Sequence, residues 1–138
     1  MIKKLLSADI SSLVNTNLSI LILRVGAGLL ILTHGWPKLL NVFNGDFSFG
    51  DPIGLGAAAS LVLAAFAEGI CGFLVTLGLG TRFASIVLSI NMFVVVFFAH
   101  AADPFGTKEK GLLFLLLFLV ITLTGGGKYS LDKNVFGK

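Results

Sequence analysis

Four apolar stretches, each long enough to cross a lipid bilayer as a helix, constrain this chain more than any other feature. A membrane-crossing helix needs about 20 mostly apolar residues, and the stretches cover residues 18–39, 53–79, 82–100 and 109–124. Only 12% of the 138 residues are charged, whereas a soluble domain has about 25%. The sequence therefore predicts an all-α membrane protein: a single domain over 1–138, built as a four-transmembrane-helix bundle.

The segment before the first stretch, residues 1–16, has two lysines near its start and so resembles a signal peptide. Ser7 and Asp9 interrupt the apolar core that a signal peptide needs. Ile2, Leu5 and Ile10 instead fall on one side of a helix. This pattern predicts an amphipathic helix that lies on the membrane surface.

The lysines and arginines outside the helix centres predict the orientation in the membrane. If both termini share one side, that side carries Lys3, Lys4, Arg82, Lys128, Lys133 and Lys138, and the other side carries Lys38, Lys108 and Lys110. Cytoplasmic segments carry the excess of basic residues, so we expect both termini in the cytoplasm. The formal net charge of +3 then reflects these helix ends, and no nucleic acid partner is expected.

Two charged residues, Arg24 and Glu68, fall inside the predicted helices. A charge costs about 2.5–3.5 kcal/mol at a helix centre, so we expect neither to face lipid. At 1.5 Å per residue their depths differ by about 6 Å, and Asn91 lies at a matching depth. The sequence thus predicts a buried Arg24–Glu68 ion pair with Asn91 hydrogen-bonded nearby. Such a pair is either a clamp that specifies the fold or a proton-responsive or ligand-anchoring site.

Small and polar residues recur at helical spacing on the first two stretches. The second stretch carries Ser60, Ala64, Glu68, Gly72 and Thr76 on one face. The first stretch carries Arg24, Gly28, Ile31 and Gly35 on one face. Because small residues let two membrane helices approach closely, these two faces are expected to pack together.

A second set of polar residues gathers toward the outer ends of the helices: His34, Trp36, Lys38, His100, Asp103 and Glu109. Histidine changes charge near neutral pH, so His34 is a candidate to hold a quinone carbonyl or to relay a proton. The alternative is that His34 and His100 are interfacial residues satisfied by water or backbone. Two histidines at similar depth can also ligate haem iron, but nothing else in the sequence suggests a haem pocket.

Other chemistry finds little support in the sequence. Cys71 is the single cysteine, so the chain cannot form an internal disulfide or a C-x-x-C centre, and the residue is expected to be an inert packing residue. No cluster has zinc-ligand spacing, and no metal site is predicted. Pro37 is expected to kink or end the first helix. The phenylalanine-rich loop 41–54 is either an interfacial anchor or a lid over the bundle.

Three motifs together resemble the DoxX family. The run from Arg24 to Lys38, RVGAGLLILTHGWPK, resembles its opening helix. The runs EGICGFL and GLGTRFA, which begin at Glu68 and Gly78, resemble its second helix and the turn into the third. LTGGGKYSLD, which ends at Asp132, resembles its C-terminal signature. The order and spacing of these motifs make the resemblance specific, and Cys71 is a departure, since the family usually has glycine there.

The resemblance implies a multi-pass protein of the bacterial inner membrane with few assigned biochemical roles. Some relatives are linked to thiosulfate:quinone or quinol oxidation, and others to a thiol and oxidative-stress complex. Three hypotheses follow: a membrane-anchor or quinone-site subunit of a redox-linked complex, a binder of a lipid or small hydrophobic molecule, or a structural subunit of a larger assembly. In the first, a partner enzyme carries the catalysis and quinone is the candidate cofactor, with none intrinsic to the chain. The partners are then the lipid bilayer, a redox enzyme or other subunit, and further copies of the chain.

Overall fold

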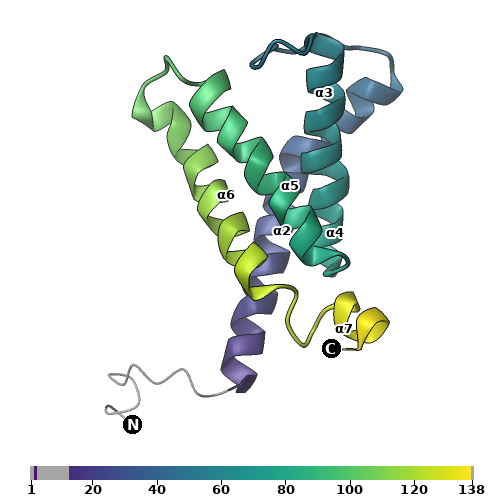
Figure 1. The fold of residues 1–138 in the computed structure, drawn as a ribbon, viewed down its shortest axis with the longest axis vertical. Helices are drawn as coiled ribbons and strands as arrows, with labels where there is room; N and C mark the ends of the chain where they lie inside the picture. The colour runs from purple at the N-terminus through teal and green to yellow at the C-terminus, as the bar shows by residue number, and fades with distance from the viewer. Residues whose placement is uncertain (1, 3–12, 138) are drawn as a thin grey trace.

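The computed structural model describes residues 2 and 13–137, and these residues form helices without any strand (Figure 1). Residues 1 and 3–12, which carry most of the predicted surface helix, lie outside the described residues. The elements follow in the order α2 (Leu13–Phe43), α3 (Ala57–Ala65), η1 (Phe66–Cys71), α4 (Gly72–Leu77), α5 (Thr81–Val94), η2 (Val95–Ala99), α6 (Phe105–Thr124) and α7 (Leu131–Phe136). The elements η1 and η2 are π-helical turns: η1 joins α3 to α4 in one continuous helix, and η2 continues α5 to its end at Ala99.

Three helical segments are long and apolar enough to cross a membrane: Thr16–Phe43, Ala57–Leu77 and Thr81–Ala99. The prediction of an all-α membrane protein is therefore confirmed. α6 has 20 residues, but Lys108, Glu109 and Lys110 occupy its first two turns. The uncharged remainder is shorter than the roughly 20 residues that span a bilayer, so the fourth span stays a prediction.

Glycines allow α2 to pack against the backbone of the next segment. A Cβ atom added at Gly35 would overlap the backbone of Glu68 and Gly69, and one added at Gly28 would overlap Thr76. From the other side, a Cβ atom at Gly72 would lie 2.9 Å from the Ile31 side chain. The predicted packing of the two small faces is confirmed.

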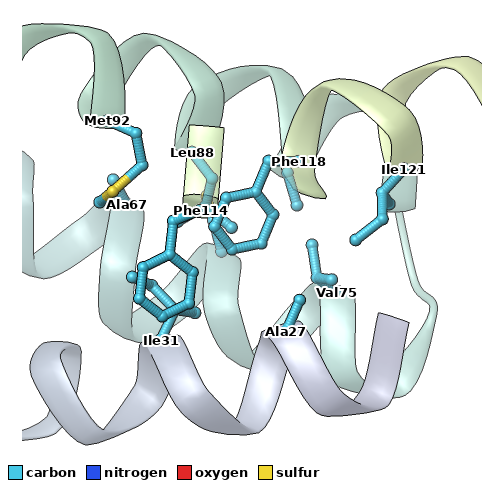
Figure 2. Packing of buried hydrophobic residues seen from close by; sticks show 11 residues of the cluster. Ala27, Ile31, Ala67, Val75, Leu88, Met92, Phe114, Phe118 and Ile121 are labelled. Atoms are coloured by element: carbon cyan, nitrogen blue, oxygen red, sulfur yellow. The ribbon is translucent and has the colours of Figure 1, made fainter. Parts of the chain in front are cut away.

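The apolar core occupies the middle of the helical assembly (Figure 2). α6 contributes Phe114 and Phe118, whose rings stack with centroids 5.9 Å apart, and α2 contributes Ala27 and Ile31. The core also holds Cys71, which is fully buried, as expected of a packing residue. Because Ala27 and Ile31 lie between Arg24 and Lys38 along α2, the core separates two polar regions.

Candidate functional site

The two buried charges do not pair with each other, so the predicted Arg24–Glu68 ion pair is wrong. Glu68 accepts a 2.6 Å contact from Lys38 Nζ on Oε2 and a 2.9 Å hydrogen bond from Asn91 Nδ2 on Oε1. Arg24 donates instead to the carbonyl oxygens of Val75 and Thr76, at 3.0 and 2.6 Å. The predicted proximity of Asn91 to Glu68 is confirmed.

The helix ends explain the error in the pairing. The expected depths of Arg24 and Glu68 were counted from Leu18 and Gly78, taken as the cytoplasmic ends of their helices. α2 begins at Leu13, and Arg24 is level with the last turn of α4. Glu68 lies seven residues before Val75, a rise of about 10 Å. It therefore lies about two helical turns beyond the level of Arg24 and meets α2 at Lys38.

Glu68 lies where three helical elements converge. It belongs to the π-turn η1, its partners Lys38 and Asn91 belong to α2 and α5, and the residue is 3% exposed. Lys38 also donates to the His34 carbonyl at 3.2 Å. α2 continues through Pro37 to Phe43 and so does not end at the proline, which places Lys38 one turn after His34 on an unbroken helix.

A cavity of about 660 Å³ opens beside this charged group. We call it the Glu68 cavity. It lies within the 300–1,000 Å³ typical of ligand pockets. The side chains that line it are mostly apolar, among them Ile31, Leu63, Phe66, Ile90 and Phe114; the polar groups on its wall include His34, Lys38, Glu68, Asn91, His100 and Lys110.

Both π-turns border the Glu68 cavity. η1 contributes Phe66, Ala67 and Glu68, and η2 contributes Val95 and Ala99. π-turns are rare and occur frequently at functional sites, where the extra residue redirects side chains. In this cavity one of them directs the carboxylate of Glu68 toward Lys38 and Asn91.

The predicted outer-face residues divide into two sets. His34, Lys38 and His100 line the Glu68 cavity, so the structure joins them to Glu68 and Asn91 in one site. Asp103 contacts His100 Nδ1 at 2.6 Å. The cavity lining includes neither Trp36, which is 60% exposed, nor Glu109. His34 lies edge-on to Phe114, with ring centroids 6.1 Å apart.

The loop after α2 covers part of the Glu68 cavity. Phe49, Gly50, Pro52 and Ile53 all contribute to its lining, which favours the lid interpretation for this half of the loop. Phe43, at the end of α2, is 82% exposed and is not part of the lining. That position suits an interfacial aromatic anchor.

Arg24 belongs to a second polar region at the opposite end of the bundle, which the sequence did not predict. Its guanidinium also donates to the Tyr129 carbonyl at 2.7 Å. Asp132 accepts hydrogen bonds from the amides of Gly80 and Thr81, at 2.7 and 2.9 Å. Arg24 and Asp132 thus fix the C-terminal segment to the turn between α4 and α5. The signal for this contact was the C-terminal signature itself, which ends at Asp132.

The surroundings of Asp132 act on its pKa in opposite directions. Burial raises the pKa, whereas hydrogen bonds from Thr81 and Gly80 and the positive charge of Arg24 lower it. The net result is a pKa below the ordinary value for aspartate, so the carboxylate stays ionised at neutral pH. In the described part of the chain, no group of three or more His, Cys, Asp or Glu side chains is placed to hold a metal ion.

Comparison with known proteins gives one family and two curated relatives. The family described as DoxX matches residues 19–101. An "Uncharacterized protein" of Haemophilus influenzae is 32% identical over 127 residues, which covers 84% of this chain and 90% of the relative. The "Putative oxidoreductase CatD" of Bacillus subtilis is 33% identical over 117 residues, which covers 84% and 86%. No solved structure gives a significant match.

Proposed function

Since the chain belongs to the DoxX family, we propose that it is the quinone-site subunit of a redox-linked membrane complex. The Glu68 cavity binds the head of the quinone, and a partner enzyme carries the redox catalysis. The oxidoreductase name of the Bacillus subtilis relative supports this assignment. The observation that carries it is a buried carboxylate, bonded to a half-buried ammonium and amide, in the wall of a mostly apolar cavity.

The polar groups match both redox forms of such a ligand. A quinone presents carbonyl oxygens that accept hydrogen bonds. Lys38 has three donor hydrogens, two of which go to Glu68 and to the His34 carbonyl, so one remains for a ligand. A quinol presents hydroxyl groups that donate, and the Glu68 carboxylate can accept them. The apolar walls suit the ring and the start of an isoprenoid tail.

The proposed topology places this site toward the outer surface. α6 serves as the fourth span, so that α2 begins and α6 ends at the same end of the bundle (Figure 1). The excess of basic residues at that end supports a cytoplasmic position for both termini in a bacterial inner membrane. The Glu68 cavity then opens near the opposite surface, between the loops that join α2 to α3 and η2 to α6.

A lipid or another small hydrophobic molecule is the second candidate ligand. The predominance of apolar side chains in the cavity favours it, because such a lining gives affinity without requiring a redox-active head group. A purely structural role remains the third hypothesis, and it requires no occupant at all.

The single tryptophan allows a direct binding test. Trp36 lies two residues after His34 on α2, and quinones quench indole fluorescence at short range. Titration of the purified protein with a short-chain benzoquinone is expected to give saturable quenching. His34→Leu is expected to weaken binding about tenfold, because the ligand loses one hydrogen-bond partner worth roughly 1.5 kcal/mol.

The matched control is Thr33→Val. Thr33 is the neighbour of His34, is exposed, and is not part of the cavity lining. The control is expected to bind as the wild type does. Quenching that rises linearly with quinone concentration, and equally in all three proteins, would show only partition into the micelle and would refute the proposal.

A further inference from the structure

A second hollow is lined by residues of α2, of the start of α5, of the turn after α6 and of α7. These segments lie at the end of the bundle where α2 begins (Figure 1). Its volume is about 740 Å³. We call it the basic groove, because Arg82, Lys128 and Lys133 line it and Asp132 is the one acidic residue among its lining. None of these residues contributes to the Glu68 cavity.

The single acidic residue does not neutralise the groove. Asp132 already accepts two backbone hydrogen bonds, from Gly80 and Thr81, and its charge also interacts with Arg24. Lys128 and Lys133 are exposed, and no ion pair involves them in the described part of the chain. The groove therefore offers uncompensated positive charge.

The turn after α6 adds backbone donors to this charge. Gly125 and Gly127 have φ angles of +72° and +75°, which allow the chain to fold tightly against Arg82 and α2. Gly126 is buried. Over residues 13–137, no backbone acceptor is found for the amide of Gly126 or of Gly127. Consecutive backbone amides of this kind bind the oxygens of phosphate groups.

The groove also has an apolar edge. Phe83, near the start of α5, and Phe136, at the end of α7, are 60% and 66% exposed and both line the groove. α5 begins at this end of a membrane-crossing segment. A ligand in the groove can therefore place a charged group against the lysines while its apolar part follows α5 into the bilayer.

We infer that the basic groove binds an anionic phospholipid through its phosphate group. Lys128, Lys133 and the amides of Gly126 and Gly127 contact the phosphate, and Phe83 and Phe136 contact the acyl chains. Basic pockets at the ends of membrane helices bind anionic headgroups in this way. The apolar edge and the position beside a spanning segment favour a lipid over free phosphate. The site is independent of the proposed quinone cavity.

The test measures lipid binding to delipidated protein in neutral detergent by native mass spectrometry. The wild type is expected to retain phosphatidylglycerol about tenfold better than phosphatidylcholine. Lys128→Gln combined with Lys133→Gln is expected to remove most of this preference, since each lysine near a membrane surface contributes about fivefold. Both side chains are exposed, so the double variant should fold.

Two controls make the result specific. Lys108→Gln removes one positive charge at the opposite end of the bundle and should leave the preference unchanged. Millimolar inorganic phosphate should not displace phosphatidylglycerol. Equal retention of both lipids, an unchanged preference in the lysine double variant, or displacement by inorganic phosphate alone would each overturn the inference.

Discussion

Replacing Lys38 with methionine is expected to lower the free energy of unfolding by about 3 kcal/mol, because the variant leaves the Glu68 carboxylate buried without its countercharge. The carboxyl side chain is 4% exposed and the lysine side chain 22% exposed. Partial access of the lysine to solvent places the expected cost at the lower end of the range for broken buried pairs. Asn91 continues to donate one hydrogen bond but carries no charge.

A double-mutant cycle separates this charge effect from lost packing. Glu68→Gln in the Lys38→Met background removes the uncompensated carboxylate, so the double variant is expected to be more stable than Lys38→Met alone. Lys108→Met is the matched control, since Lys108 has no carboxylate partner among the described residues. Its effect should stay within about 0.5 kcal/mol. Equal destabilisation by both lysine variants would contradict the role assigned to the Lys38–Glu68 contact.

Cys71 provides the readout for these measurements. It is the single cysteine of the chain and is fully buried. Its thiol becomes reactive toward a fluorescent maleimide only when the surrounding helices separate. Maleimide labelling of Cys71, measured in mixed micelles at increasing dodecyl sulfate, therefore reports the stability of each variant. No cysteine has to be added for the label.

Gly35→Ala is the second variant with a large expected effect. The new Cβ atom would overlap backbone atoms of Glu68 and Gly69, and backbone cannot move aside as a flexible side chain can. Overpacking of this kind costs about 1–3 kcal/mol or more. The helices must move apart where Glu68 meets Lys38, so quinone binding and stability should both fall.

Gly26→Ala is the control on the same helix. A Cβ atom at Gly26 has no neighbour within 4 Å, and alanine is the better helix former by about 1 kcal/mol. This control is expected to be as stable as the wild type or more so. If Gly35→Ala unfolds at the same denaturant concentration as Gly26→Ala, the close approach of α2 to η1 does not support the site.

Much of the fold could be predicted because hydropathy and glycine spacing are local properties. The stretch 82–100 and the observed segment Thr81–Ala99 differ by one residue at each end, and the small faces of the first two helices pack as expected. The start of α6 shows where this prediction reaches its limit. Composition predicted a membrane span from residue 109, whereas Lys108, Glu109 and Lys110 shorten the apolar part of the helix.

The pairing within the site could not be predicted, because it depends on how far each helix is shifted along its neighbour. Hydropathy does not give this shift, so the expected depths made Arg24 the partner of Glu68 in place of Lys38, which lies 14 residues farther along α2. Lys38 looked interfacial, yet its flexible four-carbon stem carries the ammonium to the buried carboxylate. The π-turn that holds Glu68 has no signature in the sequence.

The central claim is that the Glu68 cavity holds a quinone, and the quinone content of the protein isolated from its native membrane in mild detergent tests it most directly. Extraction and mass spectrometry are expected to find about one quinone per chain in the wild type, as for a single-site ligand pocket of this size. The content should fall sharply in Gly35→Ala and remain in Gly26→Ala. Wild-type protein that carries no quinone, or quinone in equal amounts in both glycine variants, would contradict the claim.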